Sequence, residues 1–388
     1  MNPFSSPLIT PAEYHHNATT YNATGSRRII PLAAYRPTLH SSFESFHLPG
    51  SKFFNLDQIR DTASPYPSML PSPSLFAAGM TALGIRKDDI LVIYDADEIG
   101  TYHAPRLAFM CELFGHKDVH ILNNLRRYVR MGLPVGSGSE GIEVPVVGTG
   151  REQGDEYVVE EGDIDTGRVI SFEDVKNSVL GKDQEKVRII DARIPGRFQG
   201  VQPEMDPSLR SGHIPGAVNV PLARLLEDGD AVILATEKLR SVLMDAGALA
   251  EEDEGMLYIL TCNSGVTAAS LDLALRLVGS KGSRRVYDGS WMEWTRRHVL
   301  LACSRFTGLR NQMLDKIAAR GSTPRDKITD YDSIISDPQA IRYVAEFMLQ
   351  TGLLGQFSQV ELGPDPDPDL GQEHVGLRAM GIGAEDTG

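Results

Sequence analysis

The sequence has only three cysteines among its 388 residues, and no two of them form a Cys-x-x-Cys motif. Cys111, Cys262 and Cys303 are far apart, which argues against a zinc site and against a disulfide framework. A reducing compartment fits this cysteine usage best. We expect no metal and no organic cofactor.

Basic charge and long hydrophobic runs are scarce as well. The formal net charge is -14 at pH 7, which argues against nucleic acid or an anionic membrane as a direct partner, because both attract clustered Lys and Arg. No run approaches the ~20 apolar residues of a membrane span. Residues 1–36 carry Arg27, Arg28 and Arg36 against one acid, a weak likeness to a mitochondrial presequence. We expect a cytoplasmic protein, with the mitochondrion as the alternative.

One cysteine stands where a thiol could react. An apolar run, residues 256–260, leads into Thr-Cys-Asn-Ser-Gly-Val-Thr at 261–267, and a helix-like stretch follows at 268–278. In a strand, loop and helix arranged in this way, the loop amides and the helix amino end point at the sulfur and favour its thiolate. Cys262 is therefore the predicted nucleophile. The alternative is a buried structural cysteine, the role expected for Cys111 within its apolar stretch.

The chain also repeats a pattern. His47-Leu48-Pro49-Gly50 and His213-Ile214-Pro215-Gly216 are each followed by an apolar stretch. His47 lies 48 positions before Asp95 and His213 lies 49 before Cys262, and both endpoints directly follow β-rich runs. A helix and a short strand are predicted next in each copy, at 104–114 and 119–122 and at 267–278 and 285–287. Strands that alternate with helices indicate a duplicated parallel α/β unit.

Composition divides the chain into four parts. We expect a first domain at residues 1–145, a Gly-, Glu- and Asp-rich linker at 146–165, a second domain at 166–305 and a C-terminal extension at 306–388. The extension has a possible helix at 338–354 and a Pro-Asp repeat at 363–369. This repeat is predicted to be an acidic disordered tail.

Many motifs in the same order resemble those of the tandem-rhodanese sulfurtransferases, which include mercaptopyruvate and thiosulfate sulfurtransferases. The resemblance covers roughly residues 5–305. Its motifs are Ser64-Pro65-Tyr66-Pro67, Met69-Leu70-Pro71, Ala104-Pro105-Arg106, Asp191-Ala192-Arg193, Gly196-Arg197-Phe198, 211–217, the Cys262 loop and 288–294. Each motif is weak alone, and together they are specific.

The resemblance implies an α/β fold with two tandem rhodanese-like domains, each a parallel sheet flanked by helices. It makes the first domain non-catalytic, because Asp95 occupies the position of Cys262. In such enzymes the cysteine takes a sulfane sulfur from a small-molecule donor, becomes a persulfide and passes the sulfur to a thiol, cyanide or protein acceptor. The function implied is that of a 3-mercaptopyruvate or thiosulfate sulfurtransferase.

The resemblance also assigns residues. Cys262, Ser264 and Asp57 match catalytic positions of the mercaptopyruvate type, and Arg197 matches the arginine that holds the substrate carboxylate. Arg193 is a second candidate cation. The amides of 263–267 are expected to curl around the outer sulfur, so the substrate-binding set is completed by Asn263, Gly265, Val266 and Thr267.

Two positions depart from the family pattern. The usual histidine after Pro65-Tyr66 is Ser68, and an arginine usual after the Pro-Glu-Pro segment is replaced by Asp206. We still expect a mercaptopyruvate-like donor ahead of thiosulfate, because Asn263 and Ser264 offer little charge to a dianion. Thiosulfate sulfurtransferase and a non-catalytic interaction module of the same fold remain the alternatives. A cysteine phosphatase is disfavoured, because Ala268 stands where its phosphate-binding arginine would be.

Overall fold

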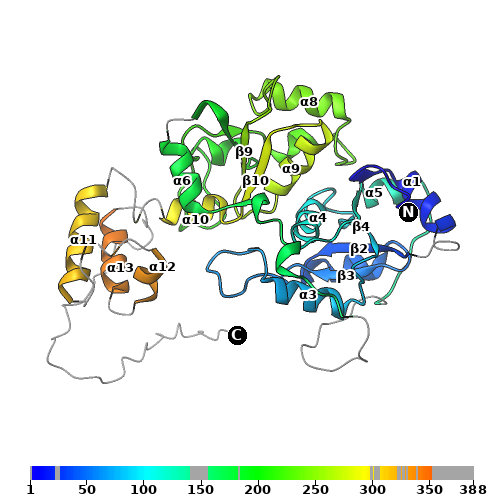
Figure 1. Cartoon of the computed structure of the whole chain (residues 1–388), viewed down its shortest axis with the longest axis horizontal. Coiled ribbons are helices and arrows are strands. Elements are labelled where there is room, and N and C mark those ends of the chain that lie inside the picture. Colours follow the sequence, from blue (N-terminus) through cyan, green and yellow to red (C-terminus); the bar gives the residue numbers. More distant parts are fainter. Residues whose placement is uncertain are drawn as a thin grey trace, which may run out of the picture. The chain divides into compact units, whose positions relative to one another are not determined.

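A computed structural model of the chain describes residues 2–21, 27–139, 156–181, 184–297, 300, 306–320, 325, 328, 331–337 and 340–351 (Figure 1). The chain divides into two compact units, Met1–Ala302 and Cys303–Gly388. No helix in the part of the chain that the structure describes is long and apolar enough to cross a membrane.

The first unit contains two parallel sheets of five strands each. The first sheet has the order β1-β5-β4-β2-β3 and the second has the order β6-β10-β9-β7-β8. The two orders are equivalent: β1 to β5 of the first sheet correspond in turn to β6 to β10 of the second. The strands are β1 (Leu8–Ile9), β2 (Ile29–Tyr35), β3 (Lys52–Asn55), β4 (Ile90–Tyr94), β5 (Val119–Leu122), β6 (Val169–Ile170), β7 (Val187–Asp191), β8 (Val218–Asn219), β9 (Leu257–Thr261) and β10 (Ser283–Tyr287).

Helices flank both sheets, so the predicted fold class is confirmed. In the first half they are α1 (Pro11–Tyr21), α2 (His40–Ser45), α3 (Pro73–Ala82), α4 (Ala104–Leu113) and α5 (Leu125–Arg130). In the second half they are α6 (Phe172–Leu180), α7 (Pro195–Phe198), α8 (Thr236–Asp245), α9 (Ala268–Leu277) and α10 (Ser290–Arg297). Short 3-10 turns lie at Pro37–Leu39, Glu161–Asp163, Thr166–Arg168, Gln184–Lys186 and Leu222–Leu225.

The middle strands explain why this sequence forms parallel sheets. All five residues of β4 are buried, as are the last four of β9, because helices cover both faces of a parallel sheet. β5 has the bounds that the sequence predicts, and β4 directly precedes Asp95 as expected, whereas β9 begins one residue late and β10 begins at Ser283 rather than at 285. Apolar runs therefore located the strands to within two residues.

The His-x-Pro-Gly echo is a real structural repeat. The His47 ring stacks on Phe43 at 4.2 Å between centroids, and its Nδ1 lies 2.8 Å from the Phe43 carbonyl oxygen. The His213 ring stacks on Phe198 at 4.2 Å, and its Nδ1 lies 2.9 Å from the Phe198 carbonyl oxygen. Each histidine thus holds the turn that leads into a β-strand.

The two halves share one hydrophobic core and a set of ion pairs. Leu107 of α4 and Leu271 of α9 are fully buried members of the same cluster. At the edge of this contact, the Glu112 carboxylate accepts hydrogen bonds from Arg168 at 2.7 Å and from Arg276 at 2.8 Å. The halves are therefore joined by apolar packing that ion pairs border.

The described part of the expected linker, residues 156–165, packs against the first half through Tyr157. Residues 146–155 lie outside the described residues, but Tyr157 is buried and its hydroxyl lies 2.9 Å from His116 Nδ1. Its amide also donates to Thr81 Oγ1 at 2.9 Å. The Tyr157 ring anchors this part of the chain on the first half, because burying it removes apolar surface from water.

The second unit differs from the expected single helix. It contains α11 (Thr307–Arg320), α12 (Tyr331–Ser336) and α13 (Ile341–Gln350). Of these, α13 falls within the predicted 338–354, while α11 and α12 were missed. Mixed polar sequence gives α11 little apolar periodicity, so its pattern alone did not reveal it. Cys303 and the Pro-Asp tail at 363–369 lie outside the described residues.

Candidate active site

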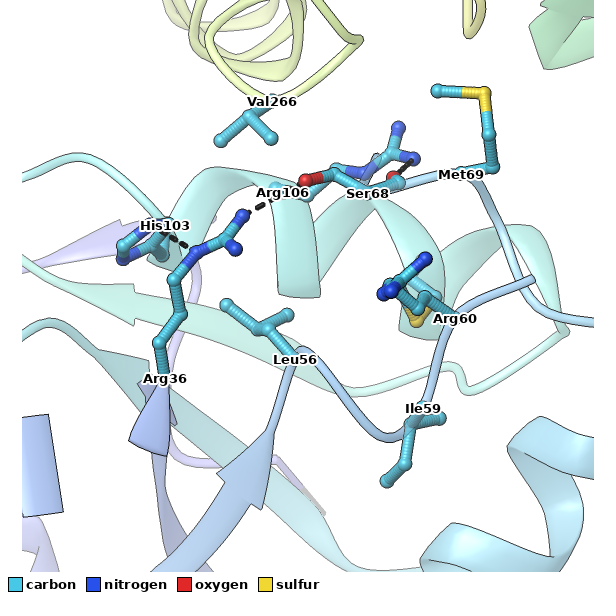
Figure 2. A pocket seen from close by; sticks show the side chains of 10 residues that line it. Arg36, Leu56, Ile59, Arg60, Ser68, Met69, His103, Arg106 and Val266 are labelled. Atoms are coloured by element: carbon cyan, nitrogen blue, oxygen red, sulfur yellow. Dashed lines mark hydrogen bonds between the residues drawn. The ribbon is translucent and has the colours of Figure 1, made fainter. Parts of the chain in front are cut away.

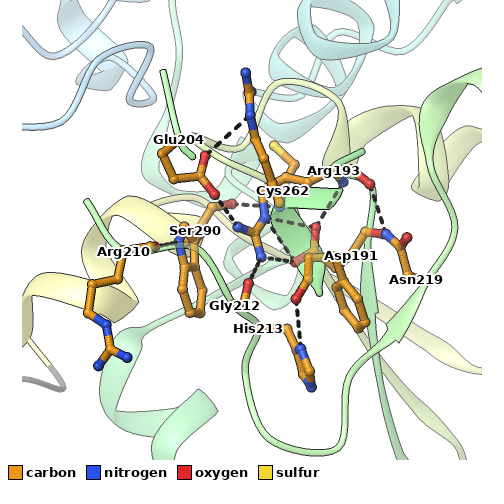
Figure 3. Close-up of polar contacts among 12 residues, drawn as sticks. Asp191, Arg193, Glu204, Arg210, Gly212, His213, Asn219, Cys262 and Ser290 are labelled. Carbon is orange, nitrogen blue, oxygen red and sulfur yellow. Dashed lines mark hydrogen bonds and ion pairs between the residues drawn. The ribbon is translucent and has the colours of Figure 1, made fainter. Parts of the chain in front are cut away.

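Cys262 is the first residue after β9, the middle strand of the second sheet, and the loop that it begins ends at α9. Its side chain lies among the polar residues drawn in Figure 3, and the residue is 2% exposed. The predicted arrangement of strand, loop and helix around this thiol is therefore present. In a parallel α/β sheet, the carboxyl ends of the strands are the usual place for a ligand.

Ser290 holds the loop in shape. Its Oγ accepts hydrogen bonds from the amides of Cys262 and Gly265, both at 3.1 Å, and donates to the Tyr287 carbonyl oxygen at 2.7 Å. Gly265 has a φ of +78°, and a Cβ there would lie 2.8 Å from the Asp288 carbonyl oxygen. Only glycine fits this left-handed, crowded position without strain. The Gly265 amide, which was expected to face the sulfur, is thus committed to Ser290.

Four other amides of the loop remain free. Among the described residues, the amides of Asn263, Ser264, Val266 and Thr267 donate to no protein acceptor. They lie between the buried cysteine and the amino end of α9, where the helix dipole places partial positive charge. Such an arrangement can stabilise an anion, whether a thiolate or the terminal sulfur of a persulfide.

In the first half, the side chain of Asp95 occupies the place that corresponds to Cys262. Asp95 follows β4 as Cys262 follows β9, and its carboxylate accepts from the amides of Tyr102, His103 and Ala104 at 2.8, 2.6 and 2.9 Å. Burial raises the pKa of this carboxyl group to about 7, and the three N–H donors oppose that rise. An acidic side chain therefore occupies the amide-lined site that Cys262 has in the second half.

Arg193 does not stand free to bind a substrate. Its guanidinium donates to Asp191 Oδ2 at 2.6 Å, to Glu204 Oε1 at 2.8 Å and to the Gly212 carbonyl oxygen at 2.6 Å (Figure 3). The side chain is 3% exposed and lies 4.4 Å above the Trp291 ring. Burial raises the pKa of Asp191 and of Glu204, and Arg193 opposes this rise in both. The geometry gives Arg193 a positioning role beneath the site, not contact with a ligand.

Arg197 is the better placed of the two expected cations. Its side chain is 22% exposed, and its Nε donates to the Pro203 carbonyl oxygen at 3.3 Å. Glu204 Oε2 is 3.8 Å away, a looser pairing than that of Arg193. Burial raises the pKa of Tyr102, the charge of Cys262 adds to the rise, and Arg36 and Arg197 oppose it. Arg197 and Cys262 therefore both act electrostatically on one tyrosine of the first half.

Asp57 and Ser264 are not joined. Asp57 Oδ1 accepts from Arg36 Nη1 at 2.5 Å, and Arg36 Nη2 donates to Ser68 Oγ at 2.8 Å. Within the described part of the chain, no hydrogen bond connects Asp57 or Ser68 with Ser264. A guanidinium thus bridges Asp57 and the residue that stands in place of the family histidine. A Ser-His-Asp relay is not formed here.

Three residues at the site were missed or underrated by sequence reasoning. Arg36 and Tyr102 come from the first half, where no local motif connects them with a cysteine more than 150 positions away. Ser290 lies 28 positions after Cys262 in the sequence, and its hydrogen bond to the Cys262 loop depends on the fold. Among the described residues, no three His, Cys, Asp or Glu side chains cluster closely enough to hold a metal ion.

Comparison with known proteins agrees with this arrangement. The family model described as "Rhodanese-like domain" matches residues 174–297. The chain is 35% identical over 277 residues to the thiosulfate sulfurtransferase of Rattus norvegicus, a match that covers 70% of this chain and 86% of that protein. It is equally 35% identical over 275 residues to the 3-mercaptopyruvate sulfurtransferase of Homo sapiens, covering 70% and 85%.

A solved structure extends the likeness to three dimensions. The Tum1 protein from Saccharomyces cerevisiae superposes with a TM-score of 0.65 at 30% identity, covering 75% of this chain and 95% of that one. The match thus spans nearly the whole of that relative. The chain belongs to the tandem-rhodanese sulfurtransferase family and is a sulfurtransferase, an enzyme with a sulfur donor and a sulfur acceptor as substrates.

Proposed function

We propose that Cys262 carries the transferred sulfur as a persulfide and that 3-mercaptopyruvate, or a similar carboxylate-bearing donor, supplies it. The Cys262 thiolate attacks the thiol sulfur of the donor and forms the S–S bond. The C–S bond breaks, its electron pair stays on carbon as an enolate, and a proton converts that enolate to pyruvate. An acceptor thiolate then attacks the outer sulfur and releases Cys262 as a thiolate.

The observation that carries this proposal is the set of four free loop amides beside Cys262. An anion forms twice at this sulfur, first as the thiolate and then as the ionised persulfide. Fixed N–H donors stabilise both without reorganisation. At the matching place in the first half, three amides likewise donate to the oxygens of Asp95 and lower the pKa of that carboxyl group, although burial outweighs them.

Charge contributed by the second half of the chain supports the order of donors. Asn263 and Ser264 next to the cysteine are neutral, and Arg197 is a half-buried cation with one loose carboxylate neighbour. A single carboxylate suits one guanidinium, whereas thiosulfate is a dianion that gains more from two cations. Thiosulfate is the alternative donor. A thiol or a protein is the proposed acceptor, with cyanide as a further acceptor.

The test is mass spectrometry of the protein after incubation with 3-mercaptopyruvate or with thiosulfate. We expect a gain of ~32 Da on the peptide that contains Cys262, and no gain in Cys262→Ser. Cys111 is a matched internal control, because this buried thiol should gain no sulfur. If neither donor adds mass to Cys262 in the folded protein, the persulfide proposal fails. The alternative of a non-catalytic interaction module would then be preferred.

The same proposal includes the roles of the parts of the chain. Residues 1–145 form the non-catalytic domain and 166–305 the catalytic domain, joined by a linker at 146–165, while 306–388 is an extension without assigned chemistry. We propose a cytoplasmic location, with the mitochondrion as the alternative. Fractionation of cells that produce the full chain separates these two locations.

A further inference from the structure

A cleft next to the Cys262 loop is rich in arginine. It has about 270 Å³ of empty space, including the part open to solvent. We name it the arginine cleft and define it by Arg36, Arg60, Ser68, His103, Arg106 and Val266, which line it (Figure 2). Five of these six residues come from the first half, and Val266 comes from the loop that Cys262 begins.

The cations of the arginine cleft outnumber the carboxylates that touch them. Arg36 pairs with Asp57 at 2.5 Å, and Arg106 pairs with Asp288 at 2.5 Å. Arg60 forms no ion pair with any described residue, and its one hydrogen bond is to the Asp61 carbonyl oxygen at 3.3 Å. The three arginines therefore face two carboxylates, which leaves one positive charge without a partner.

Two buried side chains of the arginine cleft, Arg106 and His103, have nitrogen atoms without a hydrogen-bond partner among the described residues. Arg106 is 2% exposed, and its Nε and Nη1 have no hydrogen-bond partner among the described residues. His103 is 6% exposed, and its Nδ1 has none either, although Asp95 Oδ1 lies 3.7 Å away. Buried polar groups are rarely left unpaired, because each one costs free energy that water or a ligand would recover. A bound anion would supply the acceptors that Arg106 lacks.

The arginine cleft also adjoins the loop that Cys262 begins. Arg106 Nη1 lies so near the Cys262 loop that a Cβ on Gly265 would be 3.2 Å from it. On the other side, Arg36 and Cys262 both influence the hydroxyl of Tyr102. A small molecule bound to these arginines would therefore lie beside the loop that holds the persulfide.

We propose that the arginine cleft binds the anionic end of a small substrate, a carboxylate or a sulfur oxyanion, and that Arg60 and Arg36 determine its affinity. This inference rests on the sulfur transfer proposed above and adds a second anion site to it, distinct from Arg197. Ser68 supports the assignment, since its short hydroxyl accepts from Arg36 and holds that guanidinium at the cleft.

The experiment measures anion binding by calorimetry in the full-length protein that carries both Cys262→Ser and Arg197→Ala, so that neither sulfur transfer nor the Arg197 site contributes. Pyruvate is the carboxylate probe and sulfite is the sulfur-oxyanion probe. Arg60→Gln should raise the Kd of at least one probe ~10-fold or more, the loss expected for one charge-assisted hydrogen bond. The probe that weakens tells which anion the cleft takes. Arg127→Gln is the matched control, an exposed arginine of the same half outside the cleft.

A second variant protects the result against misfolding. Arg36→Gln in the same background should also raise the Kd, and the unfolding temperature of each variant shows whether it is folded. Unchanged Kd values for both probes in both folded variants would overturn the proposal. That outcome would leave the persulfide proposal standing, because mass gain on Cys262 in the wild type is measured separately.

Discussion

Asp95 and Cys262 occupy the same place in two copies of one fold, each as the first residue after the middle strand of its sheet. In the first copy a carboxylate is bound by three backbone amides. In the second copy four amides next to the thiol have no acceptor among the residues that the structure describes. The amides in the first copy are thus occupied by the side chain of Asp95, whereas those in the second copy can donate to a ligand.

This difference makes Asp95 a source of pH dependence. Burial raises the pKa of Asp95 to about 7, whereas an unfolded aspartate titrates near ~3.9. Between these values the native state holds a proton that the unfolded state has lost. The free energy of unfolding should therefore fall as pH rises through this window, by at most ~1.4 kcal/mol per pH unit from this group, and level off above pH ~7.

Asp95→Asn isolates that effect, because other groups titrate in the same range. His103, for example, has a pKa lowered to about 3 by burial and by Arg36. Its contribution to the free energy of unfolding therefore rises with pH, whereas that of Asp95 falls. We expect the wild type to lose stability relative to Asp95→Asn from pH ~4.5 to ~7, measured by urea denaturation. Parallel stability curves for the two proteins across this range would refute the assignment.

Ser290 offers a test of how the loop is held. Ser290→Ala removes the acceptor of two buried amides, so we expect a loss of roughly 1–3 kcal/mol in the free energy of unfolding and a fall in kcat. Ser270→Ala is the control, since its hydroxyl is equally buried but has no hydrogen-bond partner among the described residues. It should change stability by less than ~1 kcal/mol. Equal losses in both variants would contradict the role given to Ser290.

The positions of Asp95 and Cys262 could be predicted because they depend on local pattern. Each follows a short apolar run that is bounded by polar residues, and such runs form the buried strands of a parallel sheet. The equal spacing from His47 and His213 then placed the two residues in matching positions. Apolar periodicity and spacing were sufficient for this part of the site.

The partners of the arginines could not be predicted in the same way. Arg193 meets Glu204 eleven positions later, and Arg36 meets Ser68 across a loop of the first half. Such pairs depend on how irregular segments fold back, and no periodicity encodes that. Family matching therefore assigned Arg193 to a ligand, although burial and two carboxylates commit it to the protein.

The ion pairs between the halves should matter for stability. Glu112→Gln deprives Arg168 and Arg276 of a shared carboxylate in a half-buried place, and we expect a loss of roughly 1–3 kcal/mol in the free energy of unfolding. Glu173→Gln is the matched control, because that glutamate is exposed and Lys176 is its one ion-pair partner in the described part of the chain. Its loss should stay below ~0.5 kcal/mol. Guanidinium denaturation of both variants measures the difference, and equal effects would show that the contact contributes nothing.

Alanine substitutions of Arg193 and Arg197 should affect different properties, the first mainly stability and the second mainly binding of the donor. Arg193→Ala leaves Asp191 and Glu204 buried without their cation, so we expect a loss of ~3–5 kcal/mol in the free energy of unfolding. Arg197→Ala removes a half-exposed cation whose pairing is loose, so stability should change by less than ~1 kcal/mol.

Kinetics complete that comparison. If Arg197 binds the donor carboxylate, Arg197→Ala should raise the KM for 3-mercaptopyruvate ~10- to 100-fold, because a hydrogen bond between charged groups contributes ~1.5–3 kcal/mol. Its kcat should change less, since the carboxylate is held equally before and during the attack by Cys262. An unchanged KM in folded Arg197→Ala would show that residues other than Arg197 bind the donor carboxylate. Denaturation and donor titration of the same two variants therefore separate a cation that supports the fold from one that binds the substrate.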